Sequence, residues 1–141
     1  MTHSSTAEII RQRGLRATKP RVTVYDALRA MGGHRTAEEI AGALADDERP
    51  SRASVFNVLD DLTRADLVMR ADRGPGAAIY EIADTWHHHF VCRECGTVID
   101  VPCVVGSKPC LDADIPGAVI DEAQIIFRGL CASCARGTGE R

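Results

Sequence analysis

The residues best suited to chemistry lie close together in the stretch HHHFVCRECGTVID, residues 87–100. It contains three successive histidines, the Cys-x-x-Cys pair Cys92 and Cys95, and a closing aspartate. Imidazole, thiolate and carboxylate groups are the usual protein ligands of divalent transition metals. The composition of this stretch therefore raises the question of whether it serves one metal site or two.

A second Cys-x-x-Cys pair, Cys131 and Cys134, lies near the C-terminus. Two such pairs in a short chain predict a structural zinc site, in which four thiolates surround the ion tetrahedrally and clamp the end of a small domain onto its beginning. Redox-active dithiols are the alternative. The two are compatible, because oxidation of zinc-bound thiolates can itself be regulatory.

The histidine run indicates a second metal site with different ligands. In a strand, His87 and His89 lie on one side and His88 lies on the other. Two carboxylates, Glu81 and Asp100, and a further histidine, His34, complete this candidate set of ligands. The full set is His34, Glu81, His87, His89 and Asp100. Such a shell of nitrogen and oxygen atoms suits Fe(II), Mn(II), Co(II), Ni(II) or Zn(II). The alternative is a histidine run on the surface that binds no metal.

The two remaining cysteines, Cys103 and Cys110, frame the segment CVVGSKPC. They could form a redox dithiol, contribute to another metal site or be inert thiols, and periodicity does not decide among these.

Helix signals dominate the residues before these ligands. A helix over residues 6–13 ends at Gly14, and a second runs from an N-cap at Thr18 to Gly32. A capping box in TAEE, residues 36–39, starts a third helix, and Ser51 caps a fourth. The strand-like runs LVMR and AAIYEI then flank a turn, which predicts a β-hairpin. Together these elements indicate a winged helix-turn-helix that binds DNA, with a helical domain of other function as the alternative.

The second half of the chain carries different signals. Short strands are expected at HHFVC and TVIDV, followed by a Gly- and Pro-interrupted stretch over 102–117 and a longer run, AVIDEAQIIFRGLC. The tail ARGTGER is expected to be mobile. We therefore expect an α+β chain with a winged-helix domain over residues 1–83 and a small α/β domain over residues 84–141.

Composition and charge are those of a soluble protein. The 141 residues carry a net charge of −3 and are 45% hydrophobic, and no apolar run approaches the roughly 20 residues that span a membrane. No secretion signal precedes the first helix, so we expect a cytoplasmic protein without a membrane partner, in which clustered cysteines favour metal. Residues 8–35 are locally basic, which fits a modest nucleic-acid footprint or a solvated helix face.

Five segments resemble, in order, the motifs of the ferric uptake regulator (Fur) family of metal-dependent transcriptional repressors. They are GLRATKPRVTVYDAL, HRTAEEI, SVFNVLDDLTRADLV, YEIADTWHHHFVCRECGTVIDV and FRGLCASC. The segments DVPCVVGSKPCL and DEAQIIFRGLC look most like the FurA/CatR-type (PerR-like) branch, which is peroxide-responsive. The resemblance implies a homodimer on a palindromic double-stranded DNA operator, repressing a catalase-peroxidase gene and its own gene.

The resemblance also assigns the ligands. It implies structural Zn(II) at Cys92, Cys95, Cys131 and Cys134. It implies a regulatory ion, Fe(II) or Mn(II) with Zn or Ni as further options, at His34, Glu81, His87, His89 and Asp100. Oxidation in peroxide-sensing relatives strikes a ligand imidazole, which makes His34 and His87 candidates here, with Cys103 and Cys110 as further oxidation-sensitive residues.

DNA contacts follow from the same resemblance and from the basic cluster. The residues expected at phosphates are Arg16, Lys19, Arg21, Ser51, Arg52 and Ser54. Phe56 and Asn57 are expected to read bases. Many relatives have Tyr-Arg at these two positions, whereas Phe can contact a thymine methyl and Asn can pair with adenine, which points to an A·T-rich operator. A third metal site of many relatives uses a histidine where this chain has EAQ, residues 122–124, so that site is expected to be absent or weak.

Two other functions fit some of these residues. One is a zinc- or nickel-sensing repressor of the same family that controls metal uptake genes. The other is a metalloenzyme in which His87, His89 and a carboxylate activate water. No nucleophile or pocket motif accompanies those ligands, so we expect the chain not to be an enzyme.

Overall fold

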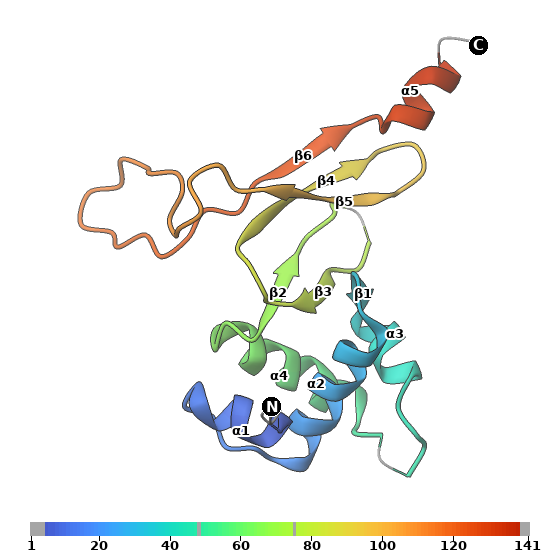
Figure 1. The fold of residues 1–141 in the computed structure, drawn as a ribbon, viewed down its shortest axis with the longest axis vertical. Coiled ribbons are helices and arrows are strands. Elements are labelled where there is room, and N and C mark those ends of the chain that lie inside the picture. The colour runs from blue at the N-terminus through green and yellow to red at the C-terminus, as the bar shows by residue number, and fades with distance from the viewer. Residues whose placement is uncertain (1–4, 48, 75, 139–141) are drawn as a thin grey trace. The chain divides into compact units, whose positions relative to one another are not determined.

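The computed structural model describes residues 5–47, 49–74 and 76–138. The chain divides into two compact units, residues 1–84 and residues 85–141, which are described one at a time (Figure 1). Helices and two separate three-stranded sheets make up these units, which confirms the expected α+β class. Among the described helices, none has the length and apolar content needed to cross a membrane.

Four helices form most of the first unit. They are α1 (Thr6–Gln12), α2 (Lys19–Met31), α3 (Ala37–Gly42) and α4 (Arg52–Arg64). Each begins at a side chain that accepts a hydrogen bond from a backbone N–H group of the first turn, as the sequence predicts for Thr18, Thr36 and Ser51. At α3 the capping box is complete, because the Glu39 carboxylate also accepts the N–H of Thr36 at 3.1 Å.

A small antiparallel sheet completes the first unit. Strands β2 (Val68–Ala71) and β3 (Ile79–Ile82) form the expected hairpin. A two-residue strand, β1 (Arg35–Thr36), pairs with the outer edge of β3 and gives the order β1-β3-β2. The sequence gives no signal for β1, because two residues are too few to carry an alternating pattern. Helices followed by this hairpin are the winged-helix arrangement expected from the sequence.

The core of the first unit joins its helices. One buried residue or more comes from each helix, and the side chains that are fully excluded from solvent are Ile10, Val24, Leu28, Ile40, Leu59 and Leu62. Their spacing of three or four positions along α2 and α4 explains why the opposite faces of these helices remain polar and exposed.

The second unit is built on a mixed sheet. Strand β4 (His87–Cys92) is central, with β5 (Val98–Pro102) antiparallel on one side and β6 (Ile126–Gly129) parallel on the other. A long loop connects β5 to β6, as Figure 1 shows, and contains no helix or strand among its residues 103–125. A final helix, α5 (Ala132–Thr138), follows β6.

The structure refines two expectations for the second unit. Within the run AVIDEAQIIFRGLC only Ile126–Gly129 is a strand, and the carbonyl of Ile125 just before it accepts the N–H of His89 at 3.2 Å. The stretch ARGTGER is not a mobile tail throughout, since its residues 135–138 continue α5; residues 139–141 lie outside the described residues.

Candidate metal centres

The four paired cysteines meet at one end of the second sheet. Cys92 ends β4, Cys95 lies in the following turn, and Cys131 and Cys134 lie at the start of α5. Their sulfur atoms all lie within 4.8 Å of one another, and Cys95 Sγ is 3.8 Å from Cys131 Sγ. Four sulfurs at the usual zinc–sulfur bond length are separated by about 3.8 Å in a tetrahedron. The cluster thus has the donors and the spacing of a structural zinc site.

Parallel pairing of β4 with β6 explains how residues so far apart in sequence meet. Cys92 stands opposite Gly129 in the register, and Arg93 N donates to Gly129 O at 2.8 Å. The backbone N–H groups of Cys95 and Cys131 both point at Cys92 Sγ, at 3.5 and 3.4 Å. Backbone groups from both Cys-x-x-Cys pairs therefore contact the Cys92 sulfur.

These contacts shift the pKa values of Cys92 and Cys134 in opposite directions. The N–H groups of Cys95 and Cys131 lower the pKa of Cys92 to about 6. The neighbouring sulfurs of Cys131 and Cys92 raise the pKa of Cys134 to about 12. Several negative sulfurs repel one another unless a cation lies among them, and a divalent ion supplies that charge.

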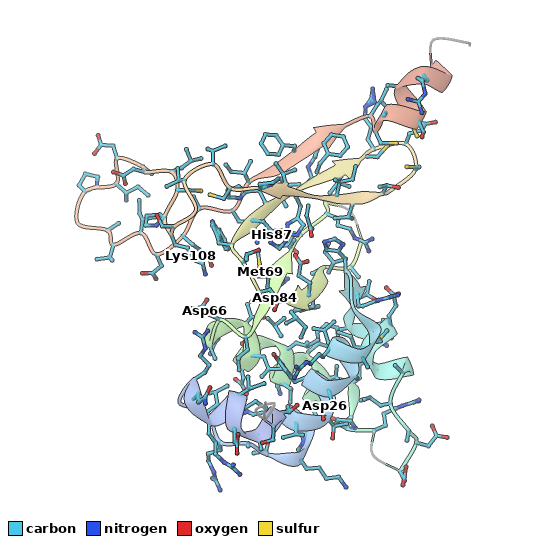
Figure 2. All side chains as sticks on the ribbon, in the orientation of Figure 1. Asp26, Asp66, Met69, Asp84, His87 and Lys108 are labelled. Atoms are coloured by element: carbon cyan, nitrogen blue, oxygen red, sulfur yellow. The ribbon has the colours of Figure 1, made fainter. Side chains whose placement is uncertain are left out.

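A second group of ligands lies farther along the same strand. His87 and His89 project from one face of β4, with ring centroids 4.8 Å apart. Asp100 lies opposite His89 on β5, and its Oδ1 is 3.3 Å from His87 Nε2 and 3.6 Å from His89 Nε2. His89 is fully buried, whereas Asp100 is half exposed. Figure 2 labels His87 at this sheet. His87, His89 and Asp100 could therefore supply three ligands to one metal ion.

The remaining two candidate ligands meet in the first unit. His34 precedes β1 and Glu81 lies in β3, and the pairing of Arg35 with Tyr80 brings their side chains together. His34 Nε2 is 3.2 Å from Glu81 Oε2, and both side chains are mostly buried. Strand β1, which the sequence does not predict, is therefore the element that positions His34.

His88 projects from the opposite face of β4, as strand alternation predicts. Its Nδ1 accepts the backbone N–H of Ile125 at 3.1 Å, and its Nε2 lies 3.2 Å from Cys110 Sγ. Burial lowers the pKa of His88, and the neighbouring His87 and His89 imidazoles lower it further. Sequence reasoning missed this contact, because it depends on how the loop between β5 and β6 folds back against the sheet.

The expected DNA-binding residues fall into two groups. Phe56 and Asn57 are exposed on α4, with 44% of Phe56 accessible, and Arg16 and Lys19 are exposed before and at the start of α2. The other four already have partners within the first unit. Arg52 pairs with Glu38 and Arg21 with Asp61, while Ser51 and Ser54 bond each other at the start of α4.

A family model and a curated relative both point to the ferric uptake regulator family. The model of the ferric uptake regulator family matches residues 12–104. The transcriptional regulator FurA of Mycobacterium tuberculosis is 44% identical over 136 residues, which cover 92% of this chain and 89% of the relative.

Solved structures agree in fold. The ferric uptake regulator of Pseudomonas aeruginosa, determined with manganese, is 28% identical and has a TM-score of 0.65 over 88% of this chain and 96% of its own. The regulator of Helicobacter pylori, described with three functional metal-binding sites, is 24% identical with a TM-score of 0.63 over 90% and 87%. The second likeness bears on the fold alone.

Proposed function

This chain belongs to the ferric uptake regulator family of metal-responsive transcriptional regulators, and we propose that it is a homodimeric, peroxide-responsive repressor. In this proposal a regulatory metal favours operator binding, and oxidation releases the operator. The targets are a catalase-peroxidase gene and the regulator's own gene. Membership in a family of regulators also sets aside the metalloenzyme alternative. The observation that carries the proposal is the presence of chemically distinct ligand groups within the units: four thiols and the His87, His89 and Asp100 group in the second unit, and the His34 and Glu81 pair in the first.

The thiol set is proposed to hold structural Zn(II). Cys92, Cys95, Cys131 and Cys134 supply a closed shell with no position for a reactant, which suits a structural rather than a sensing ion. Zinc there would stabilise the contact between β4, β6 and α5, the elements that carry these cysteines.

The imidazole and carboxylate set is proposed to hold the regulatory ion, Fe(II) or Mn(II). His34 and Glu81 are the ligands from the first unit, and His87, His89 and Asp100 are those from the second. An ion bound by residues of both units favours one relative orientation of those units, which is how metal binding would favour a shape that fits the operator. Hard oxygen and borderline nitrogen donors agree with these ions.

Oxidant sensing is proposed to occur at the same ligands. Fe(II) held by these residues would supply the electron that reduces a peroxide, and oxidation would then fall on the ligands nearest to it. The family resemblance makes His34 and His87 the candidates; the Nε2 atom of each lies beside a carboxylate, at 3.2 and 3.3 Å. Loss of a ligand would weaken metal binding and hence operator binding.

The DNA-binding surface is proposed to centre on α4. Phe56 and Asn57 read an A·T-rich sequence from its exposed side, and the exposed Arg16 and Lys19 contact phosphates. The other proposed phosphate contacts are Arg21, Ser51, Arg52 and Ser54. A DNA phosphate would have to replace Glu38 as the partner of Arg52 and Asp61 as the partner of Arg21. Phosphate contacts make the affinity fall as salt rises.

The dimer is proposed to form through the second unit. Ile99, Phe90 and Phe127 are neighbours in the register across β5, β4 and β6, and form an apolar row on one face of the sheet. Ile99 and Phe127 are nearly half exposed, at 45% and 46%. Exposed apolar rows of this kind mark interaction surfaces. A second copy of the chain would cover the row and present two α4 helices to a palindrome.

A direct test measures operator binding with and without the regulatory ion. Zinc-loaded protein would be titrated onto a fluorescent duplex from upstream of its own gene, with and without Mn(II). We expect Mn(II) to tighten binding by about tenfold or more, and Asp100→Asn to abolish that gain. Asp112→Asn, which alters an exposed carboxylate in the β5–β6 loop, should keep it. Binding that ignores Mn(II) but responds to Zn(II) or Ni(II) would support the metal-uptake alternative instead.

A further inference from the structure

A third cluster of reactive side chains lies apart from both proposed metal sites. It consists of His88, Cys103 and Cys110, of which an imidazole nitrogen and the two sulfur atoms all lie within 4.8 Å of one another. His88 is on the face of β4 opposite His87 and His89, and the two cysteines belong to the loop after β5. Two thiols and an imidazole at this separation could bind a metal or react with each other, and the hydrogen bonds distinguish these two roles.

The tautomer of His88 argues against a metal. Its Nδ1 accepts the backbone N–H of Ile125, so this nitrogen offers a lone pair and carries no proton. The imidazole proton therefore lies on Nε2, which faces Cys110 Sγ at 3.2 Å and donates to it. A nitrogen that carries a proton cannot be a metal ligand. The Nε2–H group instead positions the Cys110 sulfur and stabilises negative charge on it.

Cys103 is the more activated of the two thiols. The backbone N–H of Gly106 donates to Cys103 Sγ at 3.4 Å. This N–H lowers the pKa of Cys103, with further lowering from the Val105 backbone and from the Cys110 thiol. Its neighbour Val104 is fully exposed, so the loop lies at the surface, where a small oxidant can reach it. Activated, accessible thiols beside a second thiol are the usual sites of reversible oxidation.

We propose that Cys103 and Cys110 form a peroxide-reactive dithiol in which Cys103 attacks, Cys110 resolves and His88 positions Cys110. The Cys103 thiolate attacks one oxygen of hydrogen peroxide, the O–O bond breaks, and the departing hydroxide takes a proton to leave as water. The Cys110 sulfur then displaces hydroxide from the Cys103 sulfenic acid, and the Cys110 proton completes a second water. Two thiols lose two electrons to one peroxide and become a disulfide.

This dithiol is a second oxidant-reactive site that needs no iron. Its regulatory meaning rests on the proposed function, but its chemistry does not, so it is tested by thiol chemistry in the absence of DNA. A failure of the dithiol would leave metal-dependent repression standing. Conversely, a protein that failed to bind an operator could still form this disulfide.

The sequence provides a clean peptide for the test. Cleavage before Asp100 and Asp112 releases DVPCVVGSKPCL, which contains Cys103 and Cys110 and none of the four cysteines of the zinc set. Full-length zinc-loaded protein, stripped of iron, would be treated with hydrogen peroxide, alkylated and cleaved. We expect this peptide to lose two hydrogens and resist alkylation while zinc stays bound. A doubly alkylated peptide, or zinc release before this peptide is oxidised, would overturn the proposal.

Variants separate the two thiols. Cys110→Ser should let Cys103 gain oxygen without forming a disulfide. Cys103→Ser should leave Cys110 to oxidise about tenfold more slowly than Cys103 does in that first variant. Ser107→Ala, in the same loop, is the matched control and should behave like the parent. Equal oxidation of the two single-cysteine variants would contradict the assignment of Cys103 as the attacking thiol.

A separate pair of variants tests the positioning role of His88. His88→Leu removes the N–H donor, whereas His88→Gln keeps one at a similar reach. Disulfide formation should slow by about tenfold in His88→Leu and recover in His88→Gln. Trp86, the single tryptophan, packs edge-on against His88 at 5.6 Å between ring centroids, so its fluorescence should change as the disulfide forms. Equal rates in His88→Leu and the parent would remove His88 from the proposal.

Discussion

At the residue scale, strand alternation divides three consecutive histidines between two chemistries. His87 and His89 face the Asp100 carboxylate, where nitrogen and oxygen donors suit a divalent ion. His88 faces the thiol of Cys110 instead. One strand thus carries a candidate metal site and a candidate redox site on opposite faces, and the two can be altered separately by mutation.

The separated acidities of the zinc thiols predict how zinc binding depends on pH. Cys134, with its pKa raised to about 12, is protonated at neutral pH, so zinc must displace its proton. Cys92, with its pKa lowered to about 6, keeps its thiolate until the pH falls through that value. Zinc affinity should therefore fall as the pH falls, most steeply below about pH 6.

Competition with a chromophoric chelator at a series of pH values measures this dependence. Cys134→Ser should bind zinc far more weakly, while Cys103→Ser should match the parent. Zinc affinity that stayed constant across this pH range would contradict thiolate coordination.

The proposed base-reading role of Asn57 predicts how its substitution affects operator binding. Because Asn57 is exposed on α4, Asn57→Ala should leave the fold intact and weaken operator binding by about 1–3 kcal/mol, chiefly at one base pair. Lys19→Ala should instead weaken binding to all sequences. It should also reduce, by about one, the slope of log affinity against log salt concentration. Anisotropy titrations on an operator and its single-base variants would distinguish these outcomes. A uniform loss in Asn57→Ala would exclude a base-reading role.

The two Cys-x-x-Cys pairs and the alternation of His87 and His89 could be identified from the sequence because each pattern is local. That these residues bind metal stays a prediction, and the proximity of His34 to Glu81 depends on strand β1, which the sequence does not predict. The partner of His88 could not be predicted, since the loop over 103–125 contains no periodic pattern that would indicate where it lies. The proximity of Cys103 and Cys110 to His88 depends on the fold of the same loop.

At the element scale, the caps decide where the helices of the first unit begin. Thr18, Thr36 and Ser51 each accept a backbone N–H three residues on, which fixes the starts of α2, α3 and α4. The start of α4 in turn sets which of its residues face away from the core. Capping therefore helps to determine that Phe56 and Asn57, the proposed base-reading residues, are exposed.

The capping box of α3 can be tested by substitution. Thr36→Ala should lower the free energy of unfolding by about 1 kcal/mol, and Thr36→Ser should restore most of it. The Thr36 N–H lowers the pKa of Glu39, so ionised Glu39 stabilises the box above the usual glutamate pKa. That contribution is lost as the pH falls through the lowered value. Urea unfolding at neutral and acidic pH measures both effects, and an equal loss in Thr36→Ala and Thr36→Ser would rule out capping.

Elements with local signals could be predicted, and those without could not. The helices of the first unit and the hairpin have caps, turns and apolar periodicity. Strand β1 exists because β3 offers it a free edge, and β6 is short because β4 pairs with only part of the apolar run. Helix α5 follows Cys131 directly and was missed because its residues are mostly small and polar.

At the scale of the whole molecule, dimerisation should depend on the exposed apolar row. Phe127→Asp places a charge in the proposed interface and should convert the dimer to a monomer that still binds zinc, because Phe127 is not one of the four thiol residues. Val119→Asp, on the exposed β5–β6 loop, is the control. Analytical ultracentrifugation reads the assembly state. A Phe127→Asp protein that remained dimeric would place the interface elsewhere.

The central claim is that a regulatory metal couples peroxide to operator binding, and one measurement tests it most directly. Zinc-loaded protein would be charged with Fe(II) or with Mn(II) and exposed to hydrogen peroxide, after which operator binding and the mass of each peptide would be recorded. We expect binding to be lost in the iron form alone, with one added oxygen on His34 or His87. Unchanged binding with unmodified histidines in the iron form, or equal loss with both metals, would contradict the claim.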